Sequence, residues 1–330
     1  MSRERLFELD FVRAAAALAV VLIHSAESAT GHSGFLRLGN EVLRLAVPAF
    51  FFLSGAVVWA RPGGGRSRRR YAAILVPYVA WSALYAVLRV QRWGGGELPR
   101  DFGAFAVLGR EILTGRVWYH LYFVPVLVAL YLLAPLARVL AARRAWLPLA
   151  LSAGLAGAWG VLPLPHALPA DVARLLTDVV RYAPFAAAGM WYARARAVAL
   201  PRIVAAAPAL LGIGVAVRLL QVTAILPEWP ALRLVSVAAG LAVVAGLLGV
   251  GRSFAGSPSS AAIGTVARHS YIVYLAHPAA LALLHRFVLV NGSAASWTDT
   301  WMVGVKFAYA IAAALFVAVL VERGRQRRTA

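Results

Sequence analysis

Ionisable side chains stand at both ends of an otherwise apolar stretch near the start of the sequence, FVRAAAALAVVLIH (residues 11–24). An α-helix turns by about 100° and rises by ~1.5 Å per residue, so Arg13 and His24 project from nearly the same face, about 16 Å apart along its axis. Asp10 lies one turn before Arg13, and Glu27 lies one turn after His24. A guanidinium can bind phosphate and an imidazole can move protons. This face therefore predicts two chemistries, one at each end of a membrane-spanning helix.

A structural interpretation of the same segment is also open. Arg13 could pair with Asp10 and extend to the membrane surface, and His24 could be an ordinary interface residue. For Arg13 alone this interpretation is as good as a functional one. For the pair it is weaker, because ionisable side chains inside apolar spans are costly and usually functional.

Other apolar segments also carry candidate functional groups. His120 lies in WYHLYF, among aromatic residues typical of a membrane-interface belt. HSYIVYLAHP places Tyr274 and His277 at i, i+3 on one helix face, and structure alone explains a mid-span imidazole poorly. In FFFLSG, the pair Ser54 and Gly55 is expected to allow close helix packing, although the serine hydroxyl could also bind a substrate.

The remaining charges within spans have simpler explanations. Asp178 and Arg181, at i, i+3, are expected to neutralise each other. Arg44, Arg218 and Lys306 lie near the outer ends of spans and can extend to the surface. Three histidines facing one cavity could bind zinc, but there is no HxxxH or HxH pair and carboxylates are few, so we expect no metal site. The chain has no cysteine, which excludes disulfides and thiolate nucleophiles.

The composition indicates a membrane protein. Hydrophobic residues make up 62% of the 330 positions, whereas soluble domains contain roughly 45–50%. A transmembrane helix needs about 20 mostly apolar residues. Ten segments meet this requirement, near residues 9–27, 41–60, 71–89, 117–138, 145–162, 174–193, 203–224, 231–250, 268–290 and 300–321. We therefore expect one all-α integral-membrane domain over residues 1–330, with about ten transmembrane helices and no fused extracytoplasmic domain.

The charge distribution predicts the topology. The formal net charge is +20, and 19 of the 33 lysines and arginines fall in ends and loops that are cytoplasmic if the N-terminus is inside. This positive-inside bias predicts that both termini are cytoplasmic. The basic charge is thus explained by topology, and no nucleic-acid partner is expected. No feature of the sequence indicates an oligomeric state.

A basic loop, RPGGGRSRRR, carries five arginines between residues 61 and 70. Topology requires only a couple of them, and anionic membrane lipids could occupy the rest. The density also suits a phosphate-rich cytosolic ligand, because arginine binds phosphate through two parallel hydrogen bonds. The candidate ligand-binding residues are Arg68, Arg69 and Arg70.

Several of these motifs, taken in order, resemble membrane acyltransferase family 3 over essentially the whole chain. They are ELDFVRAAAALAVVLIH, VPAFFFLSG, the basic loop before LVPY, WYHLYFVP with LYLLAPL, RYAPFAAAGMWY and ARHSYIVYLAHP. The resemblance implies transfer of an acyl group, usually acetyl, from cytosolic acyl-CoA to a hydroxyl of a cell-envelope glycan or lipid-linked sugar. Acyl-CoA would be a co-substrate, with no bound cofactor. The expected location is the bacterial inner membrane.

The resemblance also implies roles for individual residues. His24 would be the catalytic base or a transient acyl acceptor, and Arg13 would help to hold acyl-CoA. The family often shows an RxxR pair just before the PY of its third helix. Here Arg70 is present, but Ala73 stands where the second arginine would fall. His120 is a further candidate catalytic residue, and Ser54, Tyr274 and His277 are candidates for substrate binding.

Chemistry favours this interpretation independently. A thioester is activated for acyl transfer, whereas a sugar hydroxyl is a weak nucleophile that needs a positioned base. Such a base typically contributes about 10²–10⁴-fold, and imidazole suits the task. Two alternatives remain: a macrolide-type small-molecule O-acyltransferase, and a transporter or flippase, which would need no acyl-CoA. A purely structural scaffold would leave His24 and His277 unexplained.

Overall fold

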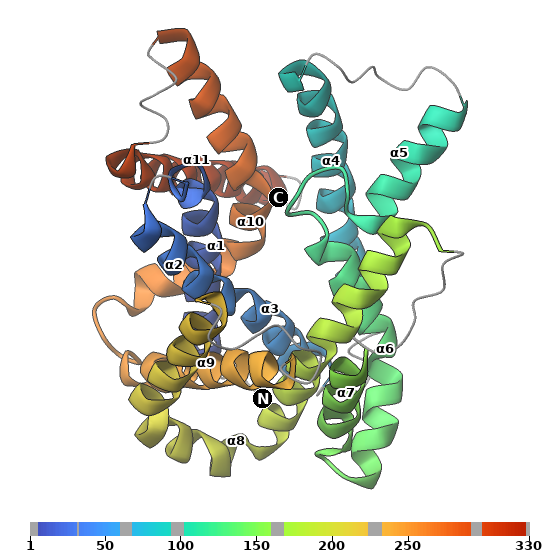
Figure 1. Cartoon of the computed structure of the whole chain (residues 1–330), viewed down its shortest axis with the longest axis vertical. Coiled ribbons are helices and arrows are strands. Elements are labelled where there is room, and N and C mark those ends of the chain that lie inside the picture. The colour runs from blue at the N-terminus through green and yellow to red at the C-terminus, as the bar shows by residue number, and fades with distance from the viewer. Residues whose placement is uncertain are drawn as a thin grey trace. The chain divides into compact units, whose positions relative to one another are not determined.

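The structure is a computed structural model that describes residues 6–31, 33–59, 68–93, 102–159, 168–223, 233–291 and 299–327. Within these ranges the chain forms helices and no strand, which confirms the all-α class (Figure 1). The chain divides into two compact units. Unit 1 comprises Met1–Leu53 and Ala195–Ala330, and unit 2 comprises Ser54–Arg194. The single domain expected over residues 1–330 stays a prediction.

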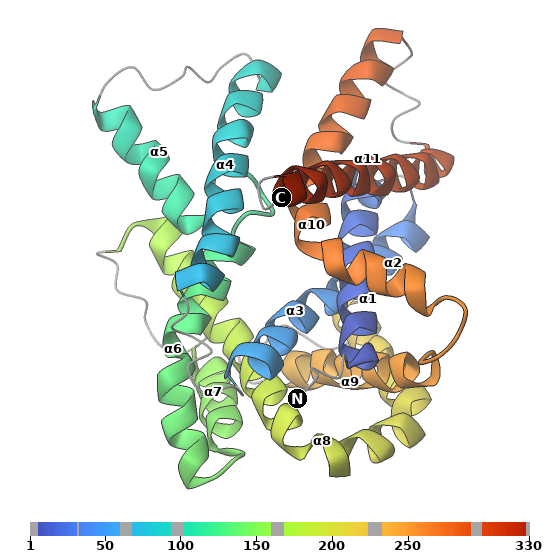
Figure 2. The ribbon, with the colours of Figure 1, turned by 180° about the vertical axis from the view of Figure 1, so that it is seen from behind.

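Unit 1 is built around α1 (Phe7–Ala26), which continues directly into a short 3₁₀-helix, η1 (Glu27–Ala29). The alanine-rich sequence of α1 favours a helix. The two acids of its first turn, Glu8 and Asp10, suit the positive end of the helix dipole. Four helices pack against α1: α2 (Gly34–Leu43), α9 (Arg233–Ser253), α10 (Ser260–Asn291) and α11 (Thr300–Arg327). Figures 1 and 2 show α10 and α11 beside α1 from two opposite sides.

The chain leaves α1 through α2, which starts at a capped turn. The Ser33 hydroxyl accepts a hydrogen bond from the Leu36 backbone N–H at 3.3 Å, as serine typically does before a helix. The 3₁₀-helix η2 (Arg44–Ala46) and α3 (Val47–Ser54) follow. This path sets Glu41 and Arg44 on neighbouring turns in unit 1.

Unit 2 holds the helices that follow in the chain. They are the π-helix η3 (Gly55–Trp59), α4 (Arg68–Trp93), α5 (Phe102–Thr114), α6 (Phe123–Arg143), α7 (Leu147–Ala158) and the first part of α8 (Ala170–Val222). In this unit α6 packs against α4, α7 and η3. A Cβ at Gly55 would overlap the backbone of Ala186, so η3 and α8 approach closely. The prediction that Ser54 and Gly55 serve close packing is confirmed for the glycine.

Seven helices in the described ranges are long and apolar enough to cross a membrane. They are Phe7–Ala29, Gly34–Val58, Arg68–Arg89, Phe123–Arg143, Ala170–Val222, Arg233–Ser253 and Thr300–Gly324. The two spans expected near 174–193 and 203–224 lie in one continuous helix, α8, and the described part of the segment near 145–162 contains the 12-residue α7. The segment near 268–290 lies in α10, where three histidines and two arginines lower the mean hydropathy. The ten spans and the cytoplasmic termini stay predictions.

Candidate active site

Arg13 lies in the first half of α1, with its side chain one-third exposed. Its Nη1 lies 3.4 Å from Oδ1 of Asp10, whose side chain is almost fully buried. The pairing with Asp10 foreseen in the structural interpretation is therefore present. Because much of the guanidinium is still accessible, the pair leaves donors that could contact a second anion.

His24 lies near the end of α1 and is held on two sides. Its Nδ1 is 3.4 Å from Oε2 of Glu27, the first residue of η1. The His277 ring from α10 stacks on the imidazole, with 5.4 Å between ring centroids and 23° between planes. Two of the histidines singled out in the sequence thus meet in unit 1, although they are more than 250 positions apart.

His277 is fully buried, as expected for a mid-span imidazole. Its Nδ1 lies 3.1 Å from the carbonyl oxygen of Val273, one turn earlier in α10. A carbonyl only accepts hydrogen bonds, so Nδ1 carries the proton in this contact. The ring of Tyr274, also predicted as a substrate-binding residue, is 6.4 Å from the His277 ring. His24, Tyr274 and His277 therefore form one aromatic cluster in unit 1.

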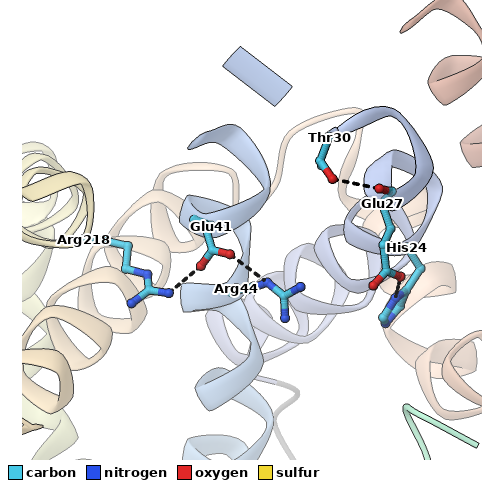
Figure 3. Close-up of polar contacts among 6 residues, drawn as sticks. All are labelled: His24, Glu27, Thr30, Glu41, Arg44 and Arg218. Carbon is cyan, nitrogen blue, oxygen red and sulfur yellow. Dashed lines mark hydrogen bonds and ion pairs between the residues drawn. The ribbon is translucent and has the colours of Figure 1, made fainter. Parts of the chain in front are cut away.

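Two carboxylates and two arginines form a charge network beside this cluster (Figure 3). We use this name for Glu27, Glu41, Arg44 and Arg218. Arg218 of α8 donates a charge-assisted hydrogen bond to Glu41, and Nε of Arg44 lies 3.5 Å from the other oxygen of Glu41. The charge of Arg44 also acts weakly on Glu27 from a distance. The prediction that Arg44 and Arg218 simply extend to the surface is incomplete, since both pair with Glu41.

Lys306 departs from the sequence-based prediction. It was expected to extend to the membrane surface, but its side chain is only 1% exposed. Its Nζ donates a hydrogen bond to Oγ of Ser28 at 2.6 Å, which joins α11 to η1. The packing of these two elements, which sequence position does not reveal, places the amine inside unit 1.

A second buried charge holds the beginning of α1. Glu8 is fully buried and pairs with Nε of Arg196 in the unit 1 part of α8, at 2.6 Å. Sequence reasoning missed this pair because the two residues are far apart in the chain. The pair fixes the end of α1 that carries Arg13.

Unit 2 contains the remaining predicted site residues. Ser54 is buried at the end of α3. Arg68, Arg69 and Arg70, which we call the α4 arginines, form the first turn of α4, and the first two are exposed. Tyr71, the next residue, packs its ring against Tyr131 of α6 at 6.3 Å. The start of α4 is thus anchored while the arginines stay accessible; Arg61 and Arg66 lie outside the described residues.

His120 lies in the segment between α5 and α6. Gly115, with φ of 74°, makes the turn that starts this segment, and its backbone packs against that of Tyr122. His120 is buried, with the Tyr85 ring 5.1 Å and the Tyr119 ring 5.5 Å from its own. The expected interface belt fits exposed Tyr119, whereas His120 belongs to a buried aromatic cluster.

The charge of Arg181 acts favourably on Asp178, as expected from their spacing, although the two side chains form no close ion pair. The Arg181 guanidinium lies over the ring of Tyr182, 5.5 Å from its centroid. Its charge acts on Asp178 from a distance, together with those of Arg116 and Arg174. The cation–π contact has replaced the i, i+3 ion pair.

The described residues contain no group of three or more His, Cys, Asp or Glu side chains arranged to hold a metal ion. The residue that sequence reasoning left out of the site is Glu27. Its i, i+3 spacing from His24 was a usable signal, because such residues share a helix face.

The long apolar helices, with ionisable side chains on their packed faces, define a multi-pass membrane protein. A family model described as an acyltransferase domain matches residues 6–323, and the chain therefore belongs to acyltransferase family 3. The protein is accordingly a membrane acyltransferase. Comparison with curated proteins and with solved structures gave no significant match.

Proposed function

We propose that this protein is an O-acetyltransferase of the bacterial inner membrane. It moves an acetyl group from cytosolic acyl-CoA to a hydroxyl of a cell-envelope glycan or lipid-linked sugar. The observation that carries the proposal is the arrangement around His24, whose imidazole is held between Glu27 and His277 on the α1 face that also carries Arg13. Ionisable side chains within apolar spans, such as His24 and the fully buried His277, are costly unless they have a function.

His24 supplies the proton chemistry. As a base, Nε2 of His24 takes the proton from the acceptor hydroxyl while the hydroxyl oxygen attacks the carbonyl carbon of the thioester. The carbon–sulfur bond then breaks, and the imidazolium returns the proton to the leaving thiolate. As an acyl carrier, Nε2 would instead attack the carbonyl first, release the thiol and pass the acetyl group to the hydroxyl in a second step. Trapping of an acetyl-imidazole on His24 distinguishes the two routes.

Arginines supply donor binding. Arg13 retains exposed donors beside its contact with Asp10, and the two exposed α4 arginines, Arg68 and Arg69, suit the phosphates of CoA. Ser54 and Tyr274 are kept as candidates for binding substrate, and His120 as a second candidate base. Membrane lipids are the other anionic ligands that the α4 arginines would meet.

The acceptor class is supported by likeness within the family. The YHLYF and ARHSYIVY stretches resemble those of the O-acetyltransferase of the enterobacterial common antigen. This favours a glycan hydroxyl over a macrolide as the acceptor.

The test has two arms. Purified protein in nanodiscs is incubated with isotopically labelled acetyl-CoA and an envelope glycan fraction, and ester-linked label is measured by mass spectrometry. In parallel, a strain lacking the gene is compared with its parent for ester-linked acyl groups on envelope glycans and on secreted metabolites. Loss of a glycan ester in the deletion strain, with ester formation in vitro, supports the proposal. Unchanged glycan esters with a changed metabolite would indicate a small-molecule acyltransferase.

A further inference from the structure

We propose that Glu27 is a positioning residue for His24: it holds the imidazole through Nδ1 so that Nε2 faces the reacting groups. This inference rests on the proposed function, since it adds to the catalytic role of His24. It is carried by the contact between Nδ1 of His24 and Oε2 of Glu27, and by the way the chain and its neighbours fix that contact (Figure 3).

The backbone brings the two side chains together. The chain changes from α-helix to 3₁₀-helix at Glu27. His24 lies in the last turn of α1 and Glu27 follows it at i+3, a spacing that places the two side chains next to each other on one helix face. Thr30 holds the turn from the far side, because its Oγ1 donates to the Glu27 carbonyl oxygen at 2.7 Å and its N–H donates to the Ala26 carbonyl at 3.1 Å.

The contact selects one tautomer of His24. An ionised carboxylate can only accept hydrogen bonds, so a neutral imidazole that faces it through Nδ1 must carry its proton there. The lone pair then lies on Nε2, which is the form a general base or a nucleophile requires. His277 covers one face of the ring. Glu27 and His277 thus restrict both rotation and tilt of the imidazole.

The charge network adds weak support for a carboxylate at position 27, whose side chain is 58% exposed. The positive charge of Arg44 acts weakly on Glu27 from a distance, and Arg44 is itself held by Glu41, which Arg218 of α8 anchors. The signs alternate along the network, so each charge supports the next. An exposed ion pair alone contributes little to the stability of the fold. Orientation of His24 is therefore the better explanation for this arrangement of charges around Glu27.

The test compares substitutions at Glu27 with one at a matched carboxylate. Glu322 also faces a histidine, His269, at 3.5 Å in the same unit, but it does not contact His24. The variants are Glu27→Gln, Glu27→Ala, Glu27→Asp and Glu322→Gln, each purified in nanodiscs. Transfer is measured with acetyl-CoA and octyl N-acetylglucosaminide, a simple amphipathic sugar used as the acceptor probe.

For a positioning role, Glu27→Gln should lower kcat by about 10–100-fold, the scale found when partners that orient metal-bound histidines are removed. KM for acetyl-CoA should not change, because donor binding does not use this carboxylate. Glu27→Asp should restore part of kcat, and added formate should partly rescue Glu27→Ala. Glu322→Gln should behave as the unmodified protein. If Glu27→Gln has normal kcat while His24→Ala is inactive, the positioning role of Glu27 is overturned and the proposed function still stands.

A second readout does not depend on transfer. Diethyl pyrocarbonate modifies accessible imidazole nitrogens, and peptide mass spectrometry gives the rate of modification at His24. Fully buried His277 is the internal reference for an inaccessible imidazole, since it should stay unmodified while the protein is folded. An oriented Nε2 should react several-fold faster in the unmodified protein than in Glu27→Gln, with Glu322→Gln unchanged. Equal or faster modification in Glu27→Gln overturns the proposal. If no ester forms with any acceptor but modification slows in Glu27→Gln, the proposed function fails and the positioning role stands.

Discussion

Substitution of His24 by alanine tests the central step of the proposed reaction. Loss of a general base typically costs about 10²–10⁴-fold in rate, equivalent to roughly 2.7–5.5 kcal/mol of activation free energy. We expect His24→Ala to lose activity at the lower end of this range. The ring of His277 lies 5.4 Å from that of His24, so it is the neighbouring group that can supply a weak replacement base. His24→Asn fills more of the space left by the imidazole with a group that cannot accept the proton, so it should lose at least as much. Alanine favours the helix, and the lost ring stacking costs only about 0.5–1.5 kcal/mol, so the variant should fold.

The assay measures donor binding and ester formation on the same purified protein. His24→Ala should bind acyl-CoA normally while transfer falls by about 10²-fold or more. Arg13→Ala should instead weaken donor binding, because its guanidinium is placed at the other end of α1. A His24→Ala variant with near-normal transfer would refute the mechanism, and His120 or His277 would become the candidate base. The double variant His24→Ala/His277→Ala then shows whether the residual activity comes from His277.

Three further predictions concern topology, donor binding and packing. Reporter fusions after Ala330 and at Thr30 should report opposite sides of the membrane, as the positive-inside bias requires; matching sides would overturn the topology. Replacing the three α4 arginines by alanine should weaken acyl-CoA binding and leave the affinity for the acceptor unchanged. Lysines at the same positions should restore donor binding only in part. An unaltered affinity for CoA would instead indicate that these arginines contact lipid. Gly55→Ala should lower the free energy of unfolding by about 1–3 kcal/mol, because its Cβ would overlap the backbone of Ala186. Gly154→Ala, where a Cβ has open space, should be neutral or stabilising. Equal melting temperatures for the two variants would contradict this account.

The sequence predicts the parts of the site that depend on local spacing. Composition and hydropathy predict the all-helical membrane class, and helix periodicity predicts that Arg13 and His24 lie on α1. The cost of a mid-span imidazole draws attention to His277, which is fully buried and stacks on His24; its role in the site stays a prediction. Predictions of this kind depend only on residue spacing within a single helix and on whether that helix lies in water or in lipid.

Contacts between distant helices could not be predicted in this way. The stacking of His24 on His277 and the burial of Lys306 depend on how α10 and α11 pack against α1 and η1. The contact of Arg181 with Tyr182 shows the same limit at short range. Spacing allowed the ion pair, but a neighbouring aromatic ring competes for the guanidinium.

The burial of Lys306 has a consequence for the chemical durability of the protein. It is the only lysine in the sequence, so every other basic side chain is an arginine. Thioesters such as acetyl-CoA acylate exposed lysine amines spontaneously, whereas guanidinium groups stay protonated and unreactive. Because its single lysine amine is enclosed and bonded to Ser28, the protein carries a strong positive charge without offering an exposed lysine for that side reaction. Amine-directed labels and cross-linkers should, for the same reason, find no exposed lysine on this chain.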